Sequence, residues 1–210
     1  MLISRNYKAE DWEALTFKSE ADWETAVAIF QDRINTRYLE HIERIIGHRT
    51  SGFAVLTLDC ALIETLEQFR QGTEETPWKQ GEKYFVSFLR GTSFKEHVSA
   101  EQASLFYTNI RCGLLHQGEA KLSLVKRSST LPLISFTEDH KGVIVNARAF
   151  HAQLQKTIYE YSDLLRKPES TKERAAFRKK MNYICQVENK PPEEVTASLS
   201  SCGLSTRFTG

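Results

Sequence analysis

An arginine and a histidine stand five residues apart in the segment 106–119, as Arg111 and His116. Histidine exchanges a proton near neutral pH, because an unperturbed imidazole has a pKa of about 6.5. Arginine keeps its charge and can direct two N–H donors at the oxygens of one phosphate. The pair therefore has the residue types needed for proton transfer beside an anionic group.

Apolar residues that recur every three or four positions predict the helices that must position this pair. Such spacing predicts a long amphipathic helix over about 20–47 and another over about 147–166. Between them, the run 53–69 is apolar on several faces, which is typical of a central helix in a bundle. A shorter helix is expected over about 84–89, ending at Gly91.

The helix that carries Arg111 and His116 has start and stop signals of its own. Ser99 is the expected N-cap, since polar residues and then spaced apolar residues follow it. Gly118 can supply the left-handed residue that ends the helix after about His116.

Two short apolar runs, 131–136 and 142–145, flank a polar turn and predict a β-hairpin at about 131–146. The expected fold is mostly α, an up-and-down helical bundle with this short β-hairpin as an insertion. We assign residues 1–168 to the helical domain, which Pro168 closes. Residues 169–210 are expected to form a basic helix followed by a weakly ordered C-terminal tail.

Composition limits the classes of protein to which the chain can belong. Lysine and arginine number 28 against 27 aspartates and glutamates, so any contact with nucleic acid must be local. The N-terminus lacks an apolar stretch of signal-peptide length, and Asp59 and Glu64 interrupt the most apolar run. The four cysteines are widely spaced and form no C-x-x-C pair. We therefore expect a cytoplasmic protein with reduced thiols and without membrane contact, metal or cofactor.

The segment Ile-Arg-Cys-Gly-Leu-Leu-His-Gln-Gly, residues 110–118, resembles the R-x(4-6)-H signature of the HEPN superfamily. The helices around 58–66 and 145–161 fit the same pattern, so the resemblance covers about residues 20–166. The expression alone is not specific, because Arg90 and His97 also satisfy it. A loop is expected between the residues of that second pair, so the helical context carries the assignment.

The resemblance implies a bundle that dimerises so that two such motifs form one cleft for single-stranded RNA. It also implies metal-independent endoribonuclease activity. His116 would take the proton from a 2′-OH, which attacks the adjacent phosphorus and leaves a 2′,3′-cyclic phosphate. Arg111 would stabilise the charged phosphorane, and a histidine of the partner subunit would act as the acid. The resemblance further implies a toxin or phage-defence effector restrained by a partner such as a nucleotidyltransferase-like antitoxin.

Helix geometry bears on how Arg111 and His116 can meet. Five residues on a regular α-helix are separated by about 140° around the axis. One chain is therefore not expected to aim both side chains inward. A two-fold dimer seam between the two directions, or a local distortion at Gly113, would let them converge. On this reasoning a monomer should be inactive.

Supporting residues are expected on the same and neighbouring helices. Glu64 lies on a stripe of small or polar residues and could orient Arg111 or His116. Asp59 is the second choice for that carboxylate. Further candidates for supporting or substrate-binding roles are Asn109, which could share the face of His116, Tyr107, which could stack on a base or brace the guanidinium, and Cys112.

Other interpretations of the pair remain open. Many active HEPN proteins carry Asn, His or Asp directly after the arginine, whereas this chain has Cys112. The alternative function is therefore a catalytically inactive HEPN module that binds nucleotide or RNA, or that scaffolds a complex. A third possibility is a helical bundle without a nucleic-acid role, which would leave Arg111 and His116 far from any cleft. The structural interpretation of the pair is that Arg111 forms a buried salt bridge and His116 caps a helix.

Overall fold

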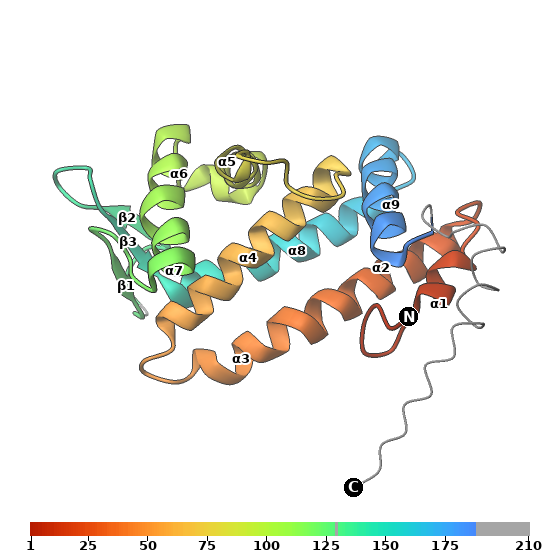
Figure 1. Cartoon of the computed structure of the whole chain (residues 1–210), viewed down its shortest axis with the longest axis horizontal. Coiled ribbons are helices and arrows are strands. Elements are labelled where there is room, and N and C mark those ends of the chain that lie inside the picture. The colour runs from red at the N-terminus through yellow and green to blue at the C-terminus, as the bar shows by residue number, and fades with distance from the viewer. Residues whose placement is uncertain (129, 188–210) are drawn as a thin grey trace, which may run out of the picture.

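The computed structural model describes residues 1–128 and 130–187, and it is mostly helical with one small sheet (Figure 1). Helix α4 (Gly52–Gln71) runs through the middle and contacts α3, α5, α7, α8 and α9, as expected for a central helix. The other helices are α1 (Ala9–Glu13), α2 (Glu20–Ile34), α3 (Glu40–Ile46), α5 (Gly81–Gly91), α8 (Ala147–Arg166), α9 (Thr171–Cys185) and the 3-10 helix η2 (Ser93–Glu96).

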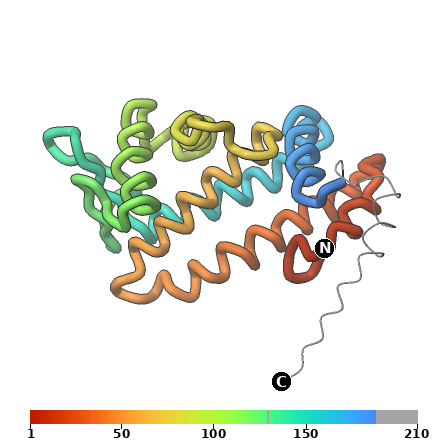
Figure 2. Tube along the Cα trace, viewed as in Figure 1, coloured from red at the N-terminus to blue at the C-terminus, as the bar shows by residue number. Residues whose placement is uncertain are grey.

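The long helix expected over about 20–47 is present as one continuous rod, which the trace in Figure 2 follows from α2 into α3. A π-helical turn, η1 (Asn35–Leu39), joins the two α-helical parts. The helix expected over about 147–166 is confirmed as α8, and the run 53–69 as α4.

The helix with the Arg111 and His116 pair consists of α6 (Ala100–Phe106), a π-helical turn η3 (Tyr107–Arg111) and α7 (Cys112–Gln117). Ser99 is its N-cap, as expected. The Ser99 side chain accepts a hydrogen bond from the Gln102 N–H at 3.2 Å, and the Gln102 side chain accepts one from the Ser99 N–H at 2.8 Å. Gly118 ends the helix with a φ of 68°, the left-handed value that glycine adopts without strain.

The expected hairpin is present, with β2 (Ile134–Phe136) antiparallel to β3 (Val143–Asn146). A third strand, β1 (Leu124–Lys126), pairs with β3 in parallel and was not expected. Three residues are too few to show an alternating pattern, which explains why the sequence did not reveal it. Because β1 follows α7 after a short loop, the sheet is connected directly to the end of the helix that carries Arg111 and His116.

Helix α9 belongs to the same core as the rest of the chain, although we expected the helical domain to end at Pro168. Phe177 packs against Phe30 and Phe69 with ring centroids 5.6 and 5.8 Å apart. Arg174 is also buried and pairs with Glu20. Aromatic burial of this size outweighs the basic composition of α9. The expected C-terminal tail lies outside the described residues.

None of the helices in the described ranges is both long and apolar enough to cross a membrane.

Candidate functional site

Arg111 and His116 meet within a single chain. Nη1 of Arg111 lies 3.2 Å from Nε2 of His116. The expectation that one chain could not bring them together assumed a regular α-helix. The helix is instead widened immediately before Arg111, where the Cys112 N–H bonds to the carbonyl of Tyr107, five residues back. This turn and the long arginine side chain allow a contact that needs no dimer seam.

Gly113 is not the point of distortion, because it lies in regular helix. Its role is close approach: a Cβ at Gly113 would lie 2.2 Å from the carbonyl oxygen of Glu119. The loop after Gly118 folds back on the helix there, and the Lys121 N–H donates to the Asn109 carbonyl at 2.9 Å. The absence of a side chain at Gly113 thus lets the chain turn from α7 into β1.

Glu64 on α4 accepts a short hydrogen bond from Nε of Arg111 and forms a salt bridge with it. Both side chains are mostly buried, with 16% and 15% of their surfaces exposed. Burial acts to lower the pKa of Arg111, but the hydrogen bond and charge of Glu64 outweigh it and raise that pKa overall. The carboxylate thus contacts Arg111 rather than His116, and it fixes one edge of the guanidinium.

Tyr107 also contacts Arg111, with the guanidinium carbon 5.3 Å from the ring centroid. This places the ring where it braces the guanidinium, one of its two expected roles. Burial raises the pKa of the Tyr107 phenol, Cys112 and Glu64 add to the rise, and the charge of Arg111 opposes it. Cys112 therefore neighbours the bracing ring.

Asp59 and Asn109 are not part of this cluster. Oδ1 of Asp59 lies 2.8 Å from Nδ1 of His151, and both side chains are buried. Asp59 is five residues before Glu64, so it points from α4 in a different direction. The side chain of Asn109 donates to the carbonyl of Lys141 at 2.7 Å and so anchors the hairpin turn. Neither residue bonds to Arg111 or His116. The pairing of Asp59 with His151 could not be predicted from residue spacing.

The exposure and hydrogen-bonding chemistry of the pair define what it can do. His116 is exposed at the end of α7, whereas Arg111 is held beneath it. A guanidinium carries donors only, so a hydrogen bond at this contact has Nε2 of His116 as its acceptor. The site therefore presents a fixed cation beside an imidazole nitrogen that carries a lone pair. Such a pair can accept a proton and stabilise an adjacent anion.

The second pair that fits the R-x(4-6)-H expression is not assembled. Arg90 donates to the backbone carbonyls of Lys95 and Val98, on either side of His97. In the described part of the chain it forms no hydrogen bond with His97. Arg90 therefore stabilises the turn after α5.

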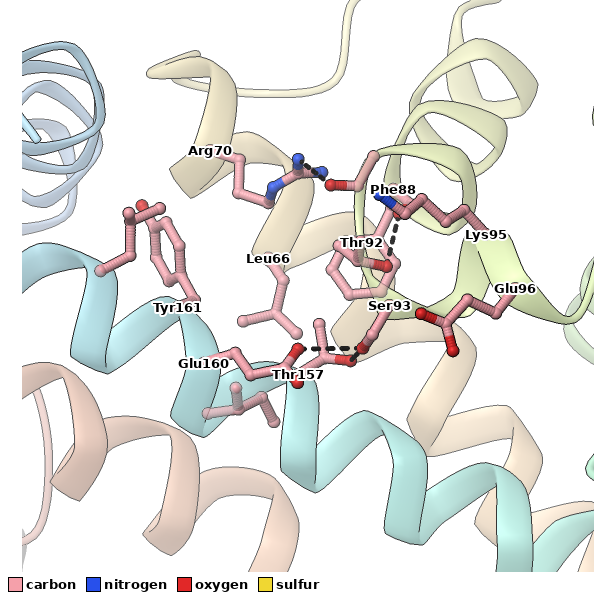
Figure 3. A pocket seen from close by; sticks show the side chains of 13 residues that line it. Leu66, Arg70, Phe88, Thr92, Ser93, Lys95, Glu96, Thr157, Glu160 and Tyr161 are labelled. Carbon is pink, nitrogen blue, oxygen red and sulfur yellow. Dashed lines mark hydrogen bonds between the residues drawn. The ribbon is translucent and has the colours of Figure 1, made fainter.

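A cavity of about 350 Å³ lies elsewhere, between α4, α5 and α8 (Figure 3). Arg70 and Lys95 lie on one side of it, and Glu160 lies on the other beside the hydroxyls of Ser93 and Thr157. Neither Arg111 nor His116 lines this cavity. A substrate of the pair would therefore bind outside this cavity. Among residues 1–128 and 130–187, no group of three or more His, Cys, Asp or Glu side chains could hold a metal ion.

Comparison of the chain with protein-family models, with curated proteins and with solved structures found no match. The assignment of a function therefore depends on the chemistry of the site itself.

Proposed function

We propose that this chain is a HEPN-type endoribonuclease that cuts RNA at Arg111 and His116 without the help of a metal ion. One observation carries the proposal: Arg111 is hydrogen-bonded to both Glu64 and His116 on the solvent-facing end of a helix. The mostly buried Glu64 carboxylate holds the cation, and the imidazole is exposed to solvent, where it can meet a substrate. The resemblance of residues 110–118 to the HEPN signature supports the same reaction class.

The proposed reaction begins when a phosphate of RNA binds the outer N–H groups of Arg111 and takes over the contact with His116. Nε2 of His116 then removes the proton from the neighbouring 2′-OH. The 2′-oxygen attacks phosphorus, and the 5′-oxygen leaves with a proton. The products are a 2′,3′-cyclic phosphate and a 5′-hydroxyl. Arg111 stabilises the phosphorane, a contribution of about 10²–10³ in rate by analogy with other anion-stabilising donors.

A second subunit would supply the acid that protonates the leaving oxygen. In the described part of the chain, His116 is the only histidine that bonds to Arg111. We propose that the partner subunit's His116 fills this role in a homodimer. Leu115, with 37% of its surface exposed beside His116, offers an apolar contact for the partner. A toxin or phage-defence role in the cytoplasm, restrained by a nucleotidyltransferase-like antitoxin, completes the proposal.

The test is cleavage of a mixed RNA by purified protein in the presence of a chelator. Wild type should yield 2′,3′-cyclic phosphate ends, and His116→Ala and Arg111→Ala should each abolish them. His97→Ala is the matched control, since His97 is also exposed and belongs to the unassembled pair. Cleavage by His116→Ala at the wild-type rate would end the proposal. Loss of specific activity on dilution below the dimer dissociation constant would support the shared site.

The second candidate is a catalytically inactive HEPN module that binds RNA or nucleotide. The observation that favours it is the presence of Cys112 directly after Arg111, with the arginine already engaged by Glu64. This candidate requires that wild type and His116→Ala bind RNA equally well and that neither cuts it.

A further inference from the structure

A second cavity, of about 680 Å³, lies where α3 turns into α4 and β1 passes alongside. Its charged lining residues among those that the structure describes are three arginines, Arg49, Arg127 and Arg148, with no aspartate or glutamate. The cavity in Figure 3, by contrast, is lined by an arginine and a lysine together with two glutamates. The chain as a whole is nearly neutral, so this concentration of one sign of charge is local.

Two of the three arginines are free to bind a ligand. Arg49 and Arg148 are exposed, and neither forms a hydrogen bond or ion pair with the described residues. Arg127 has a structural task, because its guanidinium donates to the carbonyls at the end of α3, including those of Ile46 and His48. No carboxylate of the described residues lines the cavity beside its charge. The cavity is therefore lined by two exposed guanidinium groups and by a third that backbone carbonyls hold in place.

The start of α4 adds to the positive character of this cavity. Gly52 and Phe53, its first two residues, line the cavity. The N-cap residue Ser51 donates its hydroxyl to the His48 carbonyl and not to the helix, so within residues 1–128 and 130–187 no side-chain cap bonds to the first N–H groups. The first turn also contains no acidic residue. The positive end of a long helix dipole is thus left uncompensated next to the arginines.

We infer that this cavity binds phosphate groups, through Arg49, Arg148 and the first turn of α4. The favoured source is the backbone of the RNA that Arg111 and His116 act on, and to that extent the inference rests on the proposed function. Phe53, Thr57, Ala61 and Glu64 form one partly exposed stripe along α4. The cavity and the carboxylate that holds Arg111 are therefore about 17 Å apart on the same face of one helix.

The experiment measures binding without cleavage, in the full chain carrying His116→Ala. Fluorescence anisotropy would follow a labelled single-stranded RNA of about 12 nucleotides across a salt titration, with ATP as a separate arm. The test variant is Arg49→Ala with Arg148→Ala. Its matched control is Lys172→Ala with Lys179→Ala, which removes the same charge from exposed positions on α9, at the opposite end of the molecule (Figure 1). Arg49→Lys with Arg148→Lys keeps the charge.

Loss of two phosphate contacts should weaken RNA binding about tenfold and reduce the log–log salt slope by about 1.4. The α9 control should retain the wild-type slope, and the lysine pair should retain most of the affinity. ATP binding without RNA binding, lost in the arginine variant, would show that the cavity is a phosphate site for free nucleotide. The ribonuclease proposal would then fail, while the inference of a phosphate site would stand. If the arginine variant binds RNA and ATP with the same affinities as the α9 control, the inference is overturned, whether or not wild type cuts RNA.

Discussion

Arg111 and His116 contact each other within one helical segment because the segment is not a regular α-helix at Arg111. The 3.2 Å contact between Nη1 and Nε2 follows a π-helical turn that ends at Arg111 itself. Widened turns of this kind occur often at functional sites. The irregular backbone therefore does, within one chain, what a dimer seam was expected to do. Any need for a second subunit must come from the chemistry, which requires an acid as well as a base.

Glu64 should act through Arg111, as a positioning residue. A hydrogen bond to a charged group is worth about 1.5–3 kcal/mol, so Glu64→Gln should slow single-turnover cleavage about 10–100-fold. A double-mutant cycle with Arg111→Lys separates positioning from a general structural effect. The two losses should be clearly less than additive, with little change in thermal stability between the variants. Additive losses would show that Glu64 acts independently of Arg111.

Tyr107 should matter through its ring and not through its hydroxyl. A cation over an aromatic face gains about 0.5–2 kcal/mol, so Tyr107→Leu should lower the cleavage rate about 2–30-fold. Tyr107→Phe keeps the ring 5.3 Å from the guanidinium carbon and should stay close to wild type. Single-turnover rates of the two variants, measured side by side, make the comparison. A loss in Tyr107→Phe as large as in Tyr107→Leu would assign the role to the phenol.

The helices could be predicted from the sequence because their signals are local. Apolar spacing predicted α4 and α8. Ser99 and Gly118 predicted the two ends of the helix that carries Arg111 and His116. The two π-helical turns could not be predicted, since a change of hydrogen-bond partner from four to five residues leaves no mark in residue type. The strand β1 is too short to show a period.

The candidate site was partly predictable for the same reason. Glu64 lies on the polar stripe of α4, and Tyr107 lies four residues before Arg111 on the same helix. Residue spacing could therefore predict that both lie near the pair. Asp59 pairs with His151, 92 residues away, and only the packing of α8 on α4 brings them together. The burial of Phe177 in α9 likewise depends on which helices meet. Contacts of this range are a property of the assembled core.

Gly113 should be required for stability even though it carries no chemistry. A methyl group there would lie 2.2 Å from the Glu119 carbonyl oxygen, so Gly113→Ala must push the returning loop away from α7. Overpacking of this kind costs about 1–3 kcal/mol, which urea unfolding would measure. Gly47→Ala is the matched control, because a Cβ at Gly47 meets nothing within 4 Å. Equal stabilities of the two variants would contradict the close approach.

The buried pair of Asp59 and His151 should make stability depend on pH in a distinctive direction. Burial raises the pKa of Asp59, and the hydrogen bond and charge of His151 oppose that rise without cancelling it. The folded protein thus holds this proton more tightly than the unfolded chain. The resulting contribution of Asp59 to the free energy of unfolding is complete below the unfolded pKa of about 3.9. It is lost as pH rises through the pKa of Asp59 in the folded protein. Asp59→Asn, which cannot ionise, should therefore gain stability relative to wild type as pH rises from about 4 to about 7.

Asp139 provides a control of opposite sign. Its pKa is lowered, chiefly by the hydrogen bond from the Thr137 hydroxyl and next by the Lys141 N–H, so its contribution is present above the unfolded pKa. That contribution is lost as pH falls through the folded value, and Asp139→Asn should approach wild-type stability in acid. Urea unfolding of wild type and both variants at a series of pH values tests the two directions together. A difference between Asp59→Asn and wild type that stays constant with pH would mean that burial does not hold the proton on Asp59.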